Sequence, residues 1–297
     1  MTKILNHINT YADLTAYNND KDKNYPNIAY IIETNEVKWV KEKLDLVVCK
    51  YNATSTSEAT KLLFFDFRDV TYQIIDDVKQ DTVKDTYTFD TLGEHIVKYK
   101  LDGTSISDYL FNGCSSLTSI SIPDIVTSIG MSAFSSCSGL TSIVIPNSVI
   151  SIEDFALREC TSLESIVVDS ANTVFDSRDN CNALIHTSTN KLISGCKNTV
   201  IPNTVTSIGE SSFYFCSTLT NIVIPNSVTS IGNDAFWGCR NLASVTIQAT
   251  IPPTLGNTTV FEQTNNCPIY VPAESVDAYK TATNWSSLAD RISAIVA

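Results

Sequence analysis

The residues best able to do chemistry in this sequence are its nine cysteines, because thiols bind metals, form disulfides and act as nucleophiles. Five of them recur at steps of 23 or 56 residues, namely Cys114, Cys137, Cys160, Cys216 and Cys239. No Cys-x-x-Cys pair occurs, so the spacing of a zinc site is absent. We therefore expect the five recurrent thiols to stack as small buried core residues. A disulfide between Cys181 and Cys196 remains open as an alternative.

Histidines and carboxylates offer little for catalysis. The three histidines are His7, His95 and His186, and no G-x-S-x-G or H-E-x-x-H motif accompanies them. The densest acidic set consists of Glu153, Asp154, Glu159 and Glu164. A glycosidase needs two carboxylates that face one cleft, whereas these four fall on turns and edges of a single repeat. The sequence therefore predicts that the protein is not an enzyme and needs no metal or cofactor.

Composition and charge exclude further classes of function. Hydrophobic residues make up 43% of the chain and charged residues 18%, which is typical of a packed protein. The net charge is −12, and residues 102–297 contain seven Lys and Arg against sixteen Asp and Glu. Nucleic acid is excluded as a partner, because phosphate binding needs clustered basic residues.

Membrane and export signals are absent from the sequence. No apolar run approaches the roughly 18–20 residues that span a bilayer. The first seven residues, Met1–His7, contain no apolar segment of signal-peptide length. Two alternatives stay open, a chain made without a secretion signal and a chain whose signal has been removed.

A repeat positions these residues. Its strand motif reads L-x-x-I-x-I, as in Leu117–Ile122, Leu140–Ile145 and Leu163–Val168, and it returns at Leu219 and Leu242. The full unit reads S-I-G-x-x-A-F-x-x-C-x-x-L-T-S-I-x-I-P-x-S-V-T, and one interval is longer by 33 residues. One unit cannot bury its own apolar face, whereas stacked units form a continuous core. We therefore expect a right-handed solenoid, mostly β with short helices or turns.

This motif resembles the BspA-type leucine-rich repeats of surface proteins from anaerobic bacteria and some parasitic protists. The resemblance covers residues 102–248, about half of the chain. The segments Phe175–Thr187 and Lys191–Cys196 are similar to an extended repeat of these bacterial proteins, and Cys267–Ala273 resembles their closing segment. The resemblance implies a cell-surface location and adhesion or protein binding without catalysis.

Four regions follow from these patterns. They are a β-hairpin or leader at 1–57, a small β module or N-terminal cap at 58–101, the repeats at 102–248 with an insertion at 171–198, and a C-terminal cap at 249–297. Short strand-like runs predict a β-sandwich-like module at 58–101, and Thr91–Tyr99 resembles the end of a bacterial immunoglobulin-like domain. A helix is expected over Glu274–Lys280.

Two sets of residues are candidates for contact with a partner. The first set is the outward row of strand positions: Ser119, Ser121, Ser142, Val144, Ser165, Val167, Asn221, Val223, Ser244 and Thr246. The second set is aromatic, Tyr214 and Phe215 together with Trp237, which lies 23 residues after Tyr214. Stacked units would bring Tyr214 and Trp237 side by side, as is typical of interaction anchors. The alternatives are a solvated sheet without a partner and aromatic residues that pack under the insertion or against a neighbouring segment.

The sequence favours a binding or adhesion protein, at the cell surface or secreted, whose repeats contact a protein or a glycan. A structural spacer within a larger surface or phage-like assembly is the alternative.

Overall fold

The computed structural model describes residues 29–33, 36–40, 46–64 and 67–296. Contacts divide the chain into two units, residues 1–45 and residues 46–297. In the first unit β1 (Ala29–Glu33) pairs antiparallel with β2 (Glu36–Val40), in the segment for which a hairpin is expected. His7 lies outside the described residues.

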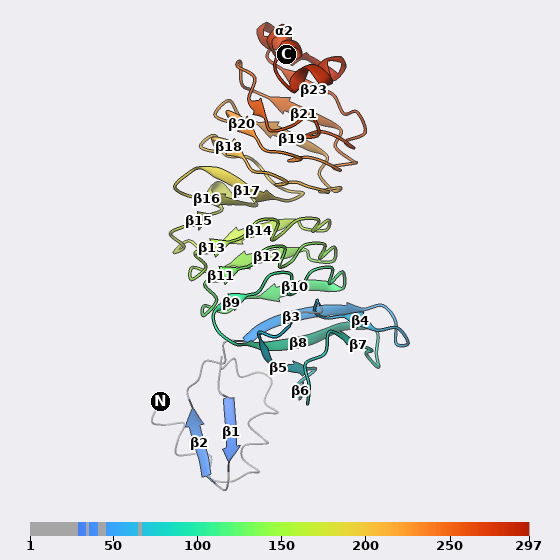
Figure 1. Ribbon diagram of the computed structural model, residues 1–297, viewed down its shortest axis with the longest axis vertical. Helices are drawn as coiled ribbons and strands as arrows, with labels where there is room; N and C mark the ends of the chain where they lie inside the picture. Colours follow the sequence, from blue (N-terminus) through green and yellow to red (C-terminus); the bar gives the residue numbers. More distant parts are fainter. Residues whose placement is uncertain (1–28, 34–35, 41–45, 65–66, 297) are drawn as a thin grey trace. The chain divides into compact units, whose positions relative to one another are not determined.

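The second unit contains a solenoid whose main wall is built of parallel strands (Figure 1). The strands of this wall are β10 (Leu117–Ser121), β12 (Ser142–Ile145), β14 (Ser165–Val168), β19 (Asn221–Ile224), β21 (Ser244–Ile247), β23 (Ile269–Val271) and β24 (Ile292–Ala294). Ser142 pairs with Ser165 and Asn221 pairs with Ser244, so each coil advances by one 23-residue unit. The mostly-β repeat solenoid predicted from the sequence is confirmed.

A second wall carries two-residue strands from the Ser-Ile positions of the repeat. These are β9 (Ser105–Ile106), β11 (Ser128–Ile129), β13 (Ser151–Ile152), β18 (Ser207–Ile208), β20 (Ser230–Ile231) and β22 (Thr254–Leu255). Both walls continue beyond residue 248, because β22 pairs with β20 and β23 pairs with β21.

Side-chain alternation explains the main wall. In β12, Ile143 and Ile145 are buried whereas Ser142 and Val144 are exposed. The same pattern recurs in β19, and it follows from the two-residue period of a strand. The buried side chains of successive coils form one core, as the L-x-x-I-x-I motif predicts.

The segment between the walls is a chain of turns rather than a helix. Each unit places two residues in the left-handed region, with φ of 52 to 75°: Tyr109 and Gly113, Ser132 and Ser136, Phe155 and Glu159, Ser211 and Phe215, then Asp234 and Gly238. Left-handed residues end helical runs. The backbone N–H groups instead bond to the next coil, as from Phe134 to the Ala156 carbonyl at 2.9 Å.

Aromatic rings stack along the inside of the coils. Phe111 and Phe134 are parallel within 3° with centroids 5.4 Å apart. Phe236 stacks between Phe213 and Phe261, with centroid distances of 4.9 Å and 5.2 Å. This buried ladder fixes the spacing of the turns, and hence of the residues that they present outside.

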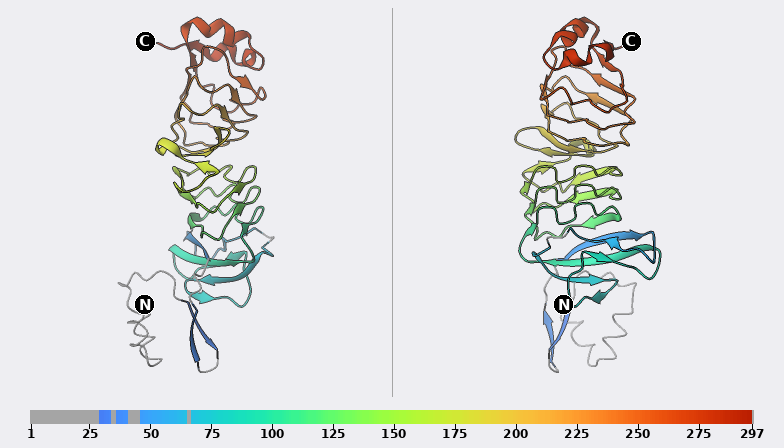
Figure 2. Two further views of the ribbon diagram at one scale, coloured as in Figure 1. Left: turned by 90° about the vertical axis from the view of Figure 1, so that its left-hand side faces the viewer. Right: turned by 45° about the vertical axis from the view of Figure 1, so that its right-hand side comes forward.

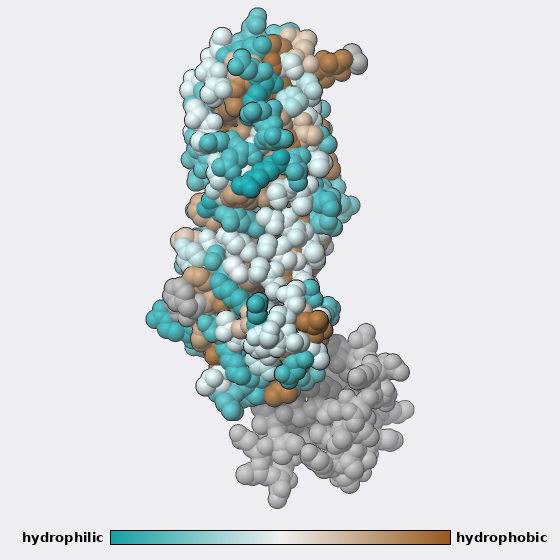
Figure 3. Space-filling model, turned by 90° about the vertical axis from the view of Figure 1, so that its right-hand side faces the viewer, coloured by the Kyte–Doolittle hydropathy of each residue, from teal (hydrophilic) through white to brown (hydrophobic). Residues whose placement is uncertain are grey.

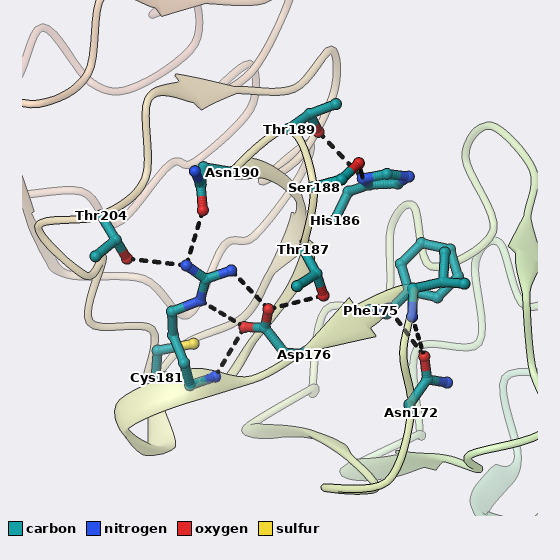
Figure 4. Close-up of polar contacts among 12 residues, drawn as sticks. Asn172, Phe175, Asp176, Cys181, His186, Thr187, Ser188, Thr189, Asn190 and Thr204 are labelled. Carbon is teal, nitrogen blue, oxygen red and sulfur yellow. Dashed lines mark hydrogen bonds and ion pairs between the residues drawn. The ribbon is translucent and has the colours of Figure 1, made fainter.

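The insertion adds an antiparallel set of strands, β15 (Phe175–Asp176), β16 (Ala183–His186) and β17 (Lys191–Gly195), with the 3₁₀ turn η1 (Arg178–Asn180). Arg178 donates two hydrogen bonds to the Asp176 carboxylate, of 2.7 Å and 2.6 Å. The same guanidinium donates to Asn190 at 2.8 Å and to Thr204 at 3.2 Å, which ties the insertion to the following coil. Figure 4 shows Asp176 on β15, with Thr187, Asn190 and Thr204 near it. The buried core separates into two clusters at this insertion.

Residues 46–101 form an antiparallel extension of the main wall. The strands are β3 (Leu46–Ala53), β5 (Val70–Ile75), β6 (Val78–Lys79) and β8 (Gly93–Leu101), with the short pair β4 (Thr60–Lys61) and β7 (Thr86–Tyr87) beside them. β3 pairs with both β8 and β10, and its buried side chains join the core of the first coils. Residues 65–66, between β4 and β5, lie outside the description. The immunoglobulin-like interpretation stays a prediction.

The C-terminal segments cover the last coil, as both views in Figure 2 show. They are η2 (Ala273–Ser275), α2 (Val276–Thr281) and η3 (Trp285–Arg291), and α2 with η2 accounts for the helix expected over 274–280. The buried Trp285 donates its Nε1–H to the Pro253 carbonyl at 2.7 Å. Among the described helices, none is long and apolar enough to cross a membrane.

Candidate functional site

The outward row of the main wall is exposed, with valines at its centre. Val144, Val167 and Val223 are 53%, 44% and 49% exposed. The hydroxyl and amide residues of the row are exposed or half-buried: Ser119, Ser121, Ser142, Ser165, Asn221, Ser244 and Thr246. No charged side chain stands in this row, so it offers an uncharged surface for contact.

Sequence reasoning missed a further exposed valine at the same repeat position, Val200, which lies outside the strands and is 72% exposed. Residues 199–203 and the start of β19 enclose a groove of about 350 Å³, and both Val200 and Val223 line it. The signal was present, because Val200-Ile-Pro lies 23 residues before Val223-Ile-Pro.

The aromatic candidates form a compact cluster on the turn side of the coils. Tyr214 and Trp237 stack with centroids 4.8 Å apart and planes 12° apart, as their spacing predicts. Phe215 meets both rings edge-on, at 5.1 Å from Tyr214 and 4.8 Å from Trp237. All three side chains are half-buried, so their edges reach the surface.

Two arginines complete the cluster, and sequence reasoning missed both. The Arg158 guanidinium lies 3.7 Å from the Tyr214 ring centroid, which is a close cation–π contact. Arg240 lies 5.4 Å from the Phe215 ring. Arg158 occupies the repeat position of Tyr214 and Trp237, and this was the available signal. We call Arg158, Tyr214, Phe215, Trp237 and Arg240 the aromatic–arginine cluster.

Arg158 reaches Tyr214 across the insertion because the turn side of the coils is continuous there. The Thr218 hydroxyl donates to the Thr161 carbonyl at 3.1 Å, although 57 residues separate the two. The insertion therefore interrupts the strand walls, while this hydrogen bond and the contact between Arg158 and Tyr214 join the turns on its two sides. Arg158 thereby covers one face of Tyr214.

Phe215 is held in an unfavourable backbone conformation. Its φ is +53°, at the repeat position where other units have Gly113, Ser136 and Gly238. The same position is left-handed in every unit, Glu159 included, and a bulky residue there costs on the order of 1 kcal/mol. Gly238 makes room for it, since a Cβ there would lie 3.0 Å from the Phe215 ring.

The nine cysteines are unpaired thiols, and all are buried. Burial raises the pKa of Cys114, Cys160 and Cys216 to about 12, so these thiols stay protonated and unreactive at neutral pH. Cys137 donates its thiol hydrogen to the Phe111 carbonyl at 3.0 Å, and this bond recurs from coil to coil. Cys196 donates to the Asn182 carbonyl at 3.2 Å and forms no disulfide with Cys181.

The acidic set is dispersed. Glu164 pairs with Lys197 at 2.6 Å, and Glu159 accepts a hydrogen bond from Ser136 at 2.9 Å. Glu153 and Asp154 are exposed on a turn. Within residues 46–64 and 67–296, no group of three His, Cys, Asp or Glu could hold a metal ion.

Two further polar groups have structural partners. His95 is buried between the Asp76 carboxylate at 2.7 Å and the Thr91 carbonyl at 2.9 Å, and its ring stacks on Phe89. His186 sits on β16 and contacts the hydroxyl of Thr189 at 3.2 Å.

The side of the molecule drawn in Figure 3 carries mainly hydrophilic and intermediate residues, with scattered hydrophobic ones. No broad apolar patch marks that side among the coloured residues. Recognition there would depend on discrete anchors rather than on extended hydrophobic contact.

A family model described as the BspA type leucine rich repeat region matches residues 104–194 and 185–282, in six copies. Together the two matches cover more than half of the sequence. Among curated proteins, none matches the sequence.

Three solved bacterial structures are similar. A leucine rich cell surface protein from Faecalibacterium prausnitzii is 25% identical, with a TM-score of 0.44, over 66% of this chain and 58% of that protein. A leucine-rich repeat protein from Eubacterium ventriosum is 20% identical, with a TM-score of 0.37, over 65% and 70%. A leucine rich repeat protein from T. pallidum is 26% identical, with a TM-score of 0.31, over 57% and 62%. This chain thus spans 58% of the length of the first of these proteins.

Proposed function

This chain belongs to the BspA-type leucine-rich-repeat family, and we propose that it is a non-catalytic binding protein, at the cell surface or secreted, whose repeats recognise a protein partner. Proteins of this family are generally non-enzymatic repeat proteins, and their repeats suggest protein binding. The observation that carries the proposal for this chain is the aromatic–arginine cluster, with Tyr214 stacked on Trp237 at 4.8 Å.

The composition of the cluster supports a role as a binding hot spot. Trp, Tyr and Arg dominate the energetics of protein interfaces. Tyr214 and Trp237 are held by stacking before any partner arrives, so binding would freeze little additional side-chain motion. The left-handed Phe215 retains a costly conformation that places its ring against both.

The arrangement favours a protein over a neutral glycan. Sugar rings stack on open aromatic faces, but Arg158 covers one face of Tyr214 and Trp237 covers the other. The edges of the rings reach the surface instead, and ring edges pack well against aliphatic and aromatic side chains.

The chemistry of the polar groups supports the absence of catalysis. Because burial raises the pKa values of the repeat thiols, few of them are present as the nucleophilic thiolate at neutral pH. Two carboxylates of the unit that carries Arg158 are engaged, Glu159 with Ser136 and Glu164 with Lys197. Such groups lack the paired geometry of a general acid and base.

Binding to an array of extracellular matrix proteins and glycans tests the proposal. Three proteins would be compared, the wild type, the double variant Tyr214→Ser/Trp237→Ser, and a control Val78→Ser/Ile150→Ser at exposed positions outside both candidate sets. We expect a saturable protein signal for the wild type and the control, and its loss in the cluster variant. Thermal unfolding checks that each variant is folded.

The structural spacer is the competing function. If the protein is a spacer, the folded wild type should bind no ligand on any array, because its repeats would only separate two parts of a larger assembly.

A second experiment tests the proposed surface location of the protein. An antibody against the chain is used to label intact cells that produce it. Staining only after the cells are permeabilised would contradict the surface proposal.

A further inference from the structure

The four arginines of residues 102–297, the repeat array together with its C-terminal cap, divide into two pairs. Arg178 is bound by Asp176, Asn190 and Thr204. Arg291 donates to backbone carbonyls of the C-terminal cap, such as Cys267 at 2.9 Å. The other two, Arg158 and Arg240, both lie on rings of the aromatic–arginine cluster. Half of the array's arginines are therefore concentrated at one place in a region whose charge is otherwise strongly negative.

These two guanidinium groups have unused hydrogen-bond donors. A guanidinium carries five N–H donors in a planar fork. The Arg158 Nε atom is buried and has no hydrogen-bond partner, and its nearest carboxylate oxygen, on Glu159, is 3.7 Å away. Arg240 makes one hydrogen bond, of 3.3 Å, to Gln263.

The aromatic residues between them add further donors. The Tyr214 hydroxyl and the Trp237 indole N–H make no hydrogen bond with any residue that the structure describes. A Trp indole N–H can only donate, and a guanidinium can only donate. The cluster thus presents a surface rich in donors and poor in acceptors, and a complementary partner must supply acceptors.

The carboxylates of the chain itself do not occupy all of the Arg158 donors. Glu159 lies on the Nε side of Arg158, and its second oxygen is held by Ser136 at 2.9 Å. Glu262 follows at the next coil and is exposed. The terminal nitrogens of Arg158 remain for a partner, since its side chain is 30% exposed.

Stacking makes Arg158 a prepared carboxylate receptor. Its guanidinium lies 3.7 Å from the Tyr214 centroid, so the planar fork is oriented before binding. Arginine forks bind carboxylates through two parallel charge-assisted hydrogen bonds. Lost rotamer freedom, which normally weakens exposed ion pairs, is small in this arrangement.

We propose that the cluster recognises an acidic protein segment, whose Asp or Glu carboxylates bind Arg158 and Arg240 while its apolar side chains pack on the edges of Tyr214 and Trp237. The proposal rests on the protein-binding function given above and names the chemistry of the partner. An anionic membrane is a poor match, because the surrounding array repels extended negative surfaces.

A peptide array tests this chemistry directly. The probes are random 12-residue peptides with two Asp or Glu each, and a matched set in which every carboxylate is replaced by the corresponding amide. The full chain is compared with Arg158→Gln/Arg240→Gln and with the control Lys197→Gln/Lys280→Gln, which removes the same charge elsewhere. We expect about tenfold stronger binding to the acidic set, its loss in the arginine variant, and its retention in the control.

Several results would overturn the inference. They are equal binding to acidic and amide peptides, equal losses in both charge variants, and capture of a sulfated glycan such as heparin in place of peptides. If a protein partner needs Tyr214 and Trp237 but shows no preference for carboxylates, the inference fails and the proposed function stands. If no probe of any kind binds the folded chain, both fail together.

Discussion

At the scale of single residues, the repeat cysteine acts as a buried hydrogen-bond donor. Its thiol reaches the carbonyl of a phenylalanine 26 residues earlier, as from Cys239 to Phe213 at 3.1 Å. Burial raises the pKa of all five repeat thiols, so ionisation is favoured in the unfolded chain alone. The stabilising contribution of each thiol is therefore complete below the unfolded pKa, about 8.5, and decreases as pH rises above it.

We predict that the free energy of unfolding falls between pH 7.5 and 9.5, by up to about 1.4 kcal/mol for each repeat thiol. Urea unfolding with a reductant present measures this. Cys160→Ala removes one titrating thiol, so its stability should depend less on pH than that of the wild type. An identical pH dependence in both proteins would show that these thiols do not titrate on unfolding.

Gly238 is the second residue with a defined consequence. Its φ is +75°, and an added Cβ would lie 3.0 to 3.2 Å from three atoms of the Phe215 ring. We expect Gly238→Ala to lower the free energy of unfolding by about 1–2 kcal/mol and to weaken partner binding by displacing Phe215.

Gly113→Ala is the matched control for this change. Gly113 has a φ of +68° at the same repeat position, but a Cβ there meets only the flexible end of Lys61. The control should show a smaller loss of stability and normal binding. If both substitutions had the same effect on stability and on binding, contact with Phe215 would be irrelevant.

At the scale of elements, the ion pair between Asp176 and Arg178 lies within the insertion and helps to hold it. Burial alone would raise the pKa of Asp176, but hydrogen bonds from Arg178 and Thr187 and the arginine charge lower it below its ordinary value. Asp176 therefore contributes stability above the unfolded pKa, about 3.9, and the contribution is lost as pH falls through its folded pKa.

We predict that Asp176→Asn lowers the free energy of unfolding at pH 7 by about 1–2 kcal/mol. Amide hydrogen exchange should accelerate in β15, β16 and β17 before it does in the coils. Asp179→Asn, an exposed change in the neighbouring turn, should leave exchange unaltered. Equal acceleration of exchange in both variants would show that the ion pair between Asp176 and Arg178 does not hold the insertion in place.

The periodicity of the repeat sufficed to predict the main wall, because a strand has a fixed two-residue alternation. It did not predict the turns, since left-handed residues such as Ser132 and Ser136 leave no mark in hydrophobic spacing. Arg158 escaped prediction because its contact with Tyr214 joins residues 56 positions apart across the insertion. Tyr214 and Trp237 were predictable, because they share a repeat position.

At the scale of the whole solenoid, each coil presents the same positions outward, so function must arise where the repeated pattern breaks. On the turn side, the units before the insertion carry Asn112 and Ser135 where those after it carry Tyr214 and Trp237. The break coincides with the coils between which the insertion lies. We therefore expect recognition at one place on the array rather than along its length.

The affinity for the best partner from the protein array, measured by titration calorimetry, tests this claim most directly. The account predicts that Tyr214→Ser/Trp237→Ser weakens binding by about 100-fold or more, as expected for paired hot-spot residues, while the variant remains folded. The control Val78→Ser/Ile150→Ser should bind like the wild type. An unchanged dissociation constant in the cluster variant would contradict the account, because recognition would then lie elsewhere on the array.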